Sequence, residues 1–358
     1  MSPSNAPVGR AWADIDLAAL VANARKVQAV SGVRLLPMVK ADGYGTGAIA
    51  VARALETLNP WGYGVATVQE GIELRSAGIR RPILVCSPLQ LDWIDACLAH
   101  GLRPAIGHTA ALDAWLGKGS EPFHLEFDTG MGRAGFRWDD VSSIRRVAEV
   151  LGGGAEGCEG VFTHFCSGHD ASASRVQWQR FQEMLASLPR RPGLVHAANS
   201  AAALRDRSLA ADLVRPGIFL YGGEVTGHVP EPVARLQARV LAVRRLAVGD
   251  TVSYDGTWSA GSPTTVATLG IGYADGVFRS LSGRGEVEID GRLAPIVGRV
   301  TMDMTMVAVD SSIEPGAVAT IFGGAVSLDR YAEWAGTIAY EALTAMGSRI
   351  ARRYGRNT

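Results

Sequence analysis

The sequence has no long hydrophobic run, and its 358 residues carry no formal net charge. No segment approaches the roughly 20 apolar residues that a membrane-spanning helix needs, and the N-terminal segment MSPSNAPVGR lacks the apolar core of a signal peptide. Lys and Arg together number 35, as do Asp and Glu, so no basic surface for nucleic acid or an anionic membrane is expected. These absences predict a cytoplasmic protein that binds neither nucleic acid nor membrane.

Cysteine is scarce. The four cysteines form no C-x-x-C pair and no dense framework, which favours reduced thiols in a cytosolic protein over a disulfide scaffold. Glycine, by contrast, accounts for 43 residues, a content that suits a fold with many tight loops. The chain length suggests two domains, because domains average about 150 residues.

Short apolar runs alternate with helical patterns from about residue 17 to 220. Candidate strands lie at 33–40, 63–68, 83–87, 102–106, 124–128, 160–165, 193–197 and 212–216, and candidate helices at 48–58, 69–78 and 175–188. In the last helix, Val176, Phe181, Met184 and Leu185 are expected on one buried face. Eight such units predict a parallel (β/α)8 TIM-type barrel. An open doubly wound sheet is the alternative, but no G-x-G-x-x-G follows the first strand.

The pattern changes after about residue 225. ARLQARVLAVRRL, TTVATLGIGYA, GEVEIDGRLAPIVGRV and MTMVAVDS predict strands separated by Gly, Pro and Asp turns, with one late helical stretch near 328–346. We therefore predict a barrel over 12–225 and a mostly β domain over 226–358, with residues 1–11 as a possible addition to the latter. The boundary falls within 222–235.

Unusual segments follow the barrel strands, where TIM-type barrels carry their active sites. Lys40 ends an apolar strand, so its amine is either a partly desolvated nucleophile or base, or an ordinary surface lysine. Ser200, Gly217 and Ile218 follow the seventh and eighth strands, where barrels often bind phosphate. Ordinary loop chemistry is the alternative there.

The segments VKADGYG, DTGMGRAGF, THF, HAANSAA, VRPGIFLYG, GYADG, VGRVTMDMTM and TIAYE occur in this order. In sequence and order they resemble the alanine racemases, which are pyridoxal-phosphate enzymes with an N-terminal barrel and a C-terminal β domain. The resemblance runs from residue 11 to residue 354. It implies an isomerase that interconverts L-alanine and D-alanine through a pyridoxal-phosphate aldimine.

The resemblance also implies how the cofactor is held. Lys40 would form the Schiff base with its aldehyde, and Arg215 would face the pyridine nitrogen. A guanidinium only donates hydrogen bonds, so it disfavours protonation of that nitrogen and limits carbanion build-up. The remaining cofactor contacts, most of them to the phosphate, would come from Tyr44, Asn199, Ser200, Gly217, Ile218 and Tyr340.

Racemisation needs a base on each face of the substrate Cα. By resemblance these are Lys40 and Tyr273, the latter from the other subunit of a head-to-tail homodimer with shared sites. His164 would link Tyr273 to the pyridine-facing arginine. Arg133 would approach the cofactor O3′ and the substrate carboxylate, and the backbone near Met302 of the partner would meet that carboxylate.

Three places depart from the family pattern, one of which is Thr301, where the family commonly has a cysteine. The segment THFCSGHD places Cys166, His169 and Asp170 together, which indicates either a variant substrate-entry loop or a metal site; we expect no metal, because the spacing is not a usual zinc pattern. Glu126 stands where many members have a carbamylated lysine that orients the following arginine. We predict that Glu126 is a permanent anion that pairs with Arg133; the alternative is a strand glutamate that faces solvent or an unrelated helix.

Three other functions compete with alanine racemisation. A racemase of broader specificity, acting on serine, lysine or arginine, has the same fold, but such relatives are expected to be exported. A pyridoxal-dependent decarboxylase usually has an acid where this chain has Arg215. A non-catalytic pyridoxal-phosphate carrier needs no second domain. An alanine racemase could either supply D-alanine as a peptidoglycan precursor or degrade it.

Overall fold

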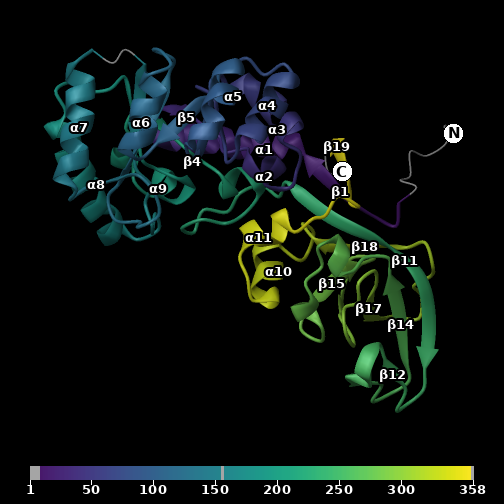
Figure 1. Cartoon of the computed structure of the whole chain (residues 1–358). Coiled ribbons are helices and arrows are strands. Elements are labelled where there is room, and N and C mark those ends of the chain that lie inside the picture. Colours follow the sequence, from purple (N-terminus) through teal and green to yellow (C-terminus); the bar gives the residue numbers. More distant parts are fainter. Residues whose placement is uncertain (1–8, 155–156, 356–358) are drawn as a thin grey trace.

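The protein, a computed structural model that describes residues 9–154 and 157–355, consists of a barrel and a β-rich part (Figure 1). The parallel barrel strands are β2 (Arg34–Leu35), β3 (Tyr63–Val65), β4 (Ile83–Pro88), β5 (Arg103–Ile106), β6 (Phe123–Asp128), β8 (Cys158–Phe162), β9 (Leu194–His196) and β10 (Leu213–Val214). Strands pair in the order β3-β4-β5-β6-β8-β9, and β10 pairs with β2. Parallel bridges Met38–Gly64 and Asn199–Arg215 close the ring. The predicted barrel is confirmed.

Helices connect these strands and cover the outside of the barrel. They are α1 (Leu17–Ser31), α2 (Lys40–Tyr44), α3 (Ala48–Leu55), α4 (Val68–Ser76), α5 (Ile94–Ala99), α6 (Thr109–Leu116), α7 (Val141–Gly152), α8 (Ala171–Ser187) and α9 (Ser200–Arg205). The side chains of Asp16, Thr67, Asp140 and Asp170 accept backbone N–H groups at the starts of α1, α4, α7 and α8. Capping residues therefore set where these helices begin.

Helix α8 differs from its prediction on one point. Its buried positions are Ser174, Gln177, Phe181 and Met184, which repeat every three or four residues as one helical face requires. Val176 is 49% exposed, so its assignment to the buried face was wrong. It lies five residues from Phe181, more than one turn of 3.6 residues, and so faces another direction.

The second part is built on a mixed sheet. Its strands pair in the order β16 (Arg292–Pro295), β15 (Glu286–Ile289), β18 (Val318–Phe322), β11 (Ala234–Leu246), β1 (Ala11–Asp16) and β19 (Ala351–Gly355), and β14 (Thr264–Leu269) joins β11 to β17 (Thr305–Val309). A small hairpin, β12 (Thr251–Val252) with β13 (Trp258–Ser259), lies apart from it. The expected late helical stretch forms α10 (Leu328–Ala335) and α11 (Ala339–Thr344). The predicted mostly β character of this part is confirmed.

The N-terminal strand β1 belongs to this second sheet. It pairs antiparallel with β11 and parallel with β19, and the Arg353 guanidinium bonds to the Asp14 carboxylate at 2.5 Å. Residues 12–16, which the sequence division placed with the barrel, thus pair with the second part, because β1 fills the position between β11 and β19, two strands from the C-terminal part of the sequence. Residues 1–8 lie outside the described residues, and the division at residue 225 stays a prediction.

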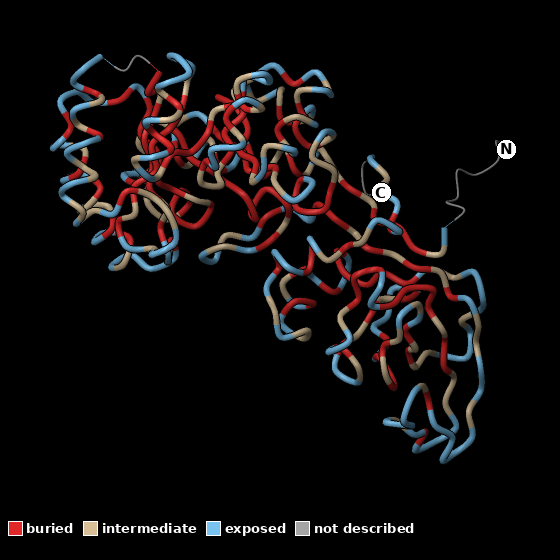
Figure 2. The backbone as a smooth tube through the Cα atoms, in the orientation of Figure 1, coloured by how far each residue is buried: buried red, intermediate tan, exposed pale blue. Residues whose placement is uncertain are grey.

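The buried residues lie in the interior of both parts of the chain. Buried backbone runs along the barrel strands and the second sheet, and exposed backbone follows the outer helices and turns (Figure 2). Within the described chain, no helix is both long and apolar enough to cross a membrane. The cytoplasmic location stays a prediction.

Candidate active site

A pocket of about 140 Å³ opens at the carboxyl ends of the barrel strands. It is lined by Met38, Lys40, Tyr44, Cys86, Glu126, Arg133, Phe162, His164, Asn199, Ser200, Arg215, Gly217, Ile218 and Tyr340. The structure therefore brings together every site residue predicted from the sequence except Tyr273 and Met302. Tyr340 comes from α11, so the second part of the chain forms one wall.

Lys40 enters the pocket from a constrained turn. It begins α2, in which Ala41 and Tyr44 have φ values of 52° and 54°, a region that non-glycine residues rarely adopt. Glu70 stabilises this turn, because its Oε1 accepts the Ala41 N–H at 2.6 Å while its Oε2 accepts the Ala66 N–H at 2.7 Å. Surrounding contacts thus fix the backbone that carries Lys40.

Arg133 reaches the pocket from a glycine turn after β6. The Asp128 carboxylate, at the end of this strand, accepts the N–H groups of Gly130, Met131 and Gly132 at 2.9, 2.9 and 3.1 Å. These three bonds wrap the backbone of the turn around the Asp128 carboxylate. Asp128 therefore fixes the backbone turn from which the Arg133 side chain enters the pocket.

Arg215 is buried beneath the pocket. It is 4% exposed, and its Nη2 donates to the carbonyl oxygens of Thr163 and Ala197 at 2.7 and 3.1 Å. Its Nη1 bonds to Nδ1 of His196 at 2.7 Å. Burial lowers the pKa of Arg215 to about 10, so the side chain stays cationic at neutral pH.

His164 contacts Arg215, as the sequence predicts. Nη2 of Arg215 lies 3.3 Å from Nδ1 of His164, and because arginine can only donate, this nitrogen is the acceptor. Burial, reinforced by the positive charges of Arg215, Arg133 and Lys40, lowers the pKa of His164 to about 3. The imidazole is therefore neutral under physiological conditions.

The loops after β9 and β10 bring small donors together. Ser200 begins α9, and Gly217 precedes the 3₁₀ turn Ile218–Tyr221; the Gly217 N–H donates to Ser200 Oγ at 2.9 Å. A Cβ on Gly217 would lie 2.2 Å from the Tyr44 hydroxyl oxygen, so only glycine permits this approach. Burial raises the pKa of Tyr44, which keeps its hydroxyl a donor. These groups fit a phosphate.

Among the described residues that line this pocket, Glu126 carries the only carboxyl. It is 3% exposed, and burial raises its pKa to about 7 although Arg133 and Arg215 oppose the shift. Across the described residues, its Oε2 has no hydrogen-bond partner and it forms no ion pair with Arg133. The structure thus shows no direct pairing of Glu126 with Arg133 among the described residues, and burial favours the neutral form of the carboxyl.

Tyr273 and Met302 lie on the second part of the chain, outside the pocket. Their side chains are 44% and 53% exposed. The backbones of the two segments are joined, because the Tyr273 N–H donates to Thr301 O at 2.9 Å and the Ala274 N–H donates to Met302 O at 3.0 Å. The chain therefore presents these two residues together, outside the pocket that contains its own Lys40.

The loop after β8 carries the unusual cysteine and histidine. Cys166 is exposed, and its N–H donates to Gln177 Oε1 at 2.9 Å. Asp170 caps α8, accepting the N–H groups of Ser172 and Ala173 at 2.8 and 3.0 Å. In the part of the chain that the structure describes, no three His, Cys, Asp or Glu side chains gather as a metal site would require.

Three contributors were missed from the sequence. For Glu70, the sequence indicates only a role at the start of a helix, because TVQE (67–70) has the T-x-x-E spacing of a capping box. It does not indicate the contact with the turn of Lys40. Cys86 lines the pocket with its thiol neutral, since burial raises its pKa to about 11. His196 begins the HAANSAA segment, but no spacing rule links it to an arginine 19 positions later.

Comparison with known proteins agrees with this arrangement. The family model for the alanine racemase N-terminal domain matches residues 15–225, and the model for the alanine racemase C-terminal domain matches residues 233–354. An alanine racemase of Carboxydothermus hydrogenoformans is 37% identical over 96% of this chain and 99% of its own length. One of Deinococcus radiodurans is 38% identical over 97% and 99%.

Solved structures agree as well. The alanine racemase of E. faecalis superimposes with a TM-score of 0.90 at 33% identity, covering 97% of this chain and 98% of its own. The Bartonella henselae alanine racemase, solved with covalently bound pyridoxal phosphate, gives a TM-score of 0.89 at 28% identity over 97% and 99%. The chain therefore belongs to the alanine racemase family of isomerases.

Proposed function

We propose that the protein interconverts L-alanine and D-alanine with pyridoxal phosphate as its cofactor. The observation that carries this proposal is the pocket in which Lys40, Arg133 and Arg215 converge beside the small donors of Ser200 and Gly217, in a chain of this family. Three cations and one carboxyl suit an anionic cofactor and a carboxylate substrate. When bound, pyridoxal phosphate draws electrons from the substrate Cα and so makes its proton removable.

The residues of the pocket divide into two ends. At one end, the Ser200 hydroxyl, the backbone at Gly217 and Ile218 and the Tyr44 hydroxyl would bind the phosphate, with Asn199 and Tyr340 beside them. At the other end, Lys40 would hold the cofactor covalently and act as the base on one face of the substrate.

Arg215 would lie against the pyridine nitrogen. Four hydrogen bonds fix its guanidinium, and because arginine only donates, it could not accept a hydrogen bond from a protonated ring nitrogen. The nitrogen therefore stays unprotonated, and less negative charge accumulates on the cofactor. This limits the reaction to moving one proton at the substrate Cα.

The second base in this proposal is Tyr273 of the partner subunit. Its exposure and its absence from the lining of its own pocket support a head-to-tail homodimer, in which each copy would complete the other's site. His164 would contact this tyrosine and Arg215 together. Met302 of the partner subunit would present its backbone to the substrate carboxylate, opposite Arg133.

Glu126 would act on Arg133 through the pocket and not by direct contact. The two side chains line the same cavity, and the arginine lowers the pKa of the carboxyl against the effect of burial. An ionised Glu126 would in turn attract the guanidinium across the cavity through its charge. The negative charge that many family members obtain from a carbamylated lysine would then come from the chain itself.

A chiral assay tests the proposal. The enzyme should form D-alanine from L-alanine at a rate well above its rates on serine, lysine and arginine, because Tyr340 and the partner's Tyr273 would narrow the entrance. Comparable rates on the larger amino acids would favour a broad-specificity racemase. Cofactor binding without any racemisation would favour a carrier.

A further inference from the structure

We infer that Arg10 and Arg349 are positioning residues for Tyr273 and act through a closed ring of four charged side chains. The ring consists of Arg10, Asp275, Asp303 and Arg349. The inference rests on the proposed function, because it takes Tyr273 as the base that the other subunit uses. It adds to that function the device that holds this base in place.

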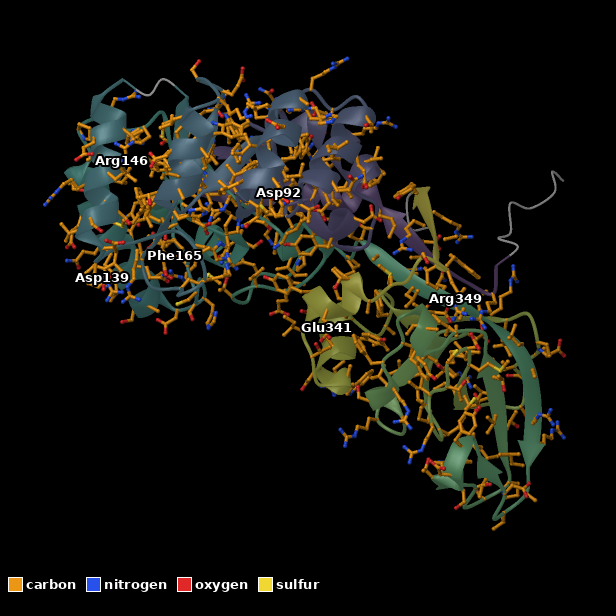
Figure 3. All side chains as sticks on the ribbon, viewed as in Figure 1. Asp92, Asp139, Arg146, Phe165, Glu341 and Arg349 are labelled. Atoms are coloured by element: carbon orange, nitrogen blue, oxygen red, sulfur yellow. The ribbon has the colours of Figure 1, made fainter. Side chains whose placement is uncertain are left out.

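Each arginine of the ring bridges both carboxylates. Arg10 Nη2 lies 3.1 Å from Asp275 Oδ2 and 3.0 Å from Asp303 Oδ1. Arg349 Nη2 lies 2.9 Å from Asp275 Oδ1, and its Nη1 lies 2.9 Å from Asp303 Oδ1. Figure 3 shows Arg349 near the long strand β11. The four residues come from distant parts of the sequence, so only the fold brings them together.

One member of the ring is buried. The Asp275 side chain is 2% exposed, whereas Arg10, Asp303 and Arg349 are 32%, 44% and 46% exposed. A buried carboxylate needs its partners, because removing one leaves a desolvated charge without compensation. The two arginines also lower the pKa of Asp303. The ring therefore depends on both guanidinium groups.

The buried carboxylate bonds directly to the turn that carries Tyr273. Asp275 Oδ2 accepts the Gly272 N–H at 3.0 Å, which closes the 3₁₀ turn Tyr273–Asp275. A Cβ on Gly272 would lie 2.3 Å from the Thr301 carbonyl oxygen, so this turn packs tightly against the segment that leads to Met302. Asp303 is the next residue, and Arg10 Nη1 also donates to its carbonyl oxygen at 3.0 Å.

The ring thus fixes both sides of one structural unit. Asp275 holds the turn of Tyr273, Asp303 holds the loop of Met302, and the arginines connect them. The Tyr273 ring is half-exposed, so its position depends on the backbone that carries it. A displacement of about 1 Å at a reacting group can lower a rate by about 100-fold.

The test uses mixed dimers, because the inference assigns the effect of Arg349→Gln to one subunit. The reference dimer combines a Lys40→Ala subunit with a Tyr273→Phe subunit. Its only complete site takes Lys40 from the second subunit and Tyr273 from the first. Arg349→Gln is then added either to the Lys40→Ala subunit, which supplies Tyr273, or to the Tyr273→Phe subunit, which does not.

We expect kcat to fall by about 10- to 100-fold in the first case and to match the reference in the second. Arg349→Lys, which keeps the charge but not the double bridge, should give an intermediate value. Equal losses in both arrangements would overturn the inference. Both dimers contain the same substitution, so equal losses would indicate a general loss of stability and not an effect on Tyr273. No activity in the reference dimer would refute the shared site itself, and the inference with it.

A matched control is available on the same segment. Arg353 is 37% exposed and pairs with Asp14 at 2.5 Å, and among the described residues no ion pair joins it to the ring. Arg353→Gln should leave kcat at the reference value whichever subunit carries it. A loss as large as that of Arg349→Gln would show that any ion pair near the C-terminus has this effect, and would overturn the inference.

Discussion

Arg215 donates a 2.7 Å hydrogen bond to Nδ1 of His196, and both side chains are buried inside the barrel. Since arginine only donates, this nitrogen accepts and the His196 proton lies on Nε2. That Nε2 is 2.8 Å from Nδ1 of His124, which must accept in turn. The next atom, Nε2 of His124, lies 3.5 Å from Glu159 Oε2. A line of neutral imidazoles with fixed tautomers therefore runs from the active site through the core.

Replacing His196 with phenylalanine should destabilise the protein. An aromatic ring is kept, but Nη1 of Arg215 loses its buried acceptor. An unsatisfied buried donor costs about 1–3 kcal/mol, and more when it is charged. Urea unfolding should show a lower midpoint with an unchanged slope. His100→Phe is the control, because His100 is exposed; an equal shift in both variants would contradict the argument.

Stability should fall as the pH drops below about 6.5. Burial is the main cause that lowers the pKa values of His124, His164 and His196. Between about pH 5 and 6.5 the unfolded chain therefore binds protons that the folded protein does not. Each histidine contributes up to about 1.4 kcal/mol per pH unit to the loss. Urea midpoints at pH 7.5 and 5.5 measure it, and equal midpoints would refute it.

Glu126 should change the stability with pH in the opposite direction to the histidines. Its pKa is raised from 4.5 to about 7, so between these values the folded protein holds a proton that the unfolded chain releases. This group therefore gains stability as the pH falls and offsets part of the histidine loss. Glu126→Gln removes the offset, and its stability should fall more steeply with acid than that of the wild type.

Much of this arrangement follows from local sequence. The eight strands are short apolar runs, and parallel strands place the segments after Lys40, Asp128 and Ser200 at one end of the barrel. Contacts between distant segments do not follow from such patterns. The bond from Glu70 to the turn of Lys40, the pairing of β1 with β19 and the charged ring around Asp275 each depend on tertiary packing. The absent pairing of Glu126 with Arg133 has the same origin, because seven residues of separation do not specify where a glycine turn leads.

Lys40→Ala should abolish both racemisation and the visible absorbance of the bound cofactor. The chain has only two other lysines, Lys26 and Lys118, and both are exposed. Borohydride reduction followed by peptide mapping should therefore find the cofactor on the peptide that contains Lys40. Lys118→Ala is the control and should keep absorbance and activity. Attachment to either of the other lysines would contradict the assignment.

The last prediction concerns the charge of Glu126. If its ionised form orients Arg133, the KM for alanine should rise as the pH falls through about 7, the pKa of this carboxyl, and Glu126→Gln should have a high KM with no change across that range. Glu126→Lys should recover affinity only with added bicarbonate, because a carbamylated lysine restores the negative charge. The wild type, whose carboxylate belongs to the chain, should not respond to bicarbonate. Wild-type affinity in Glu126→Gln would show that the residue does not act on Arg133, and a bicarbonate response of the wild type would place the required anion elsewhere.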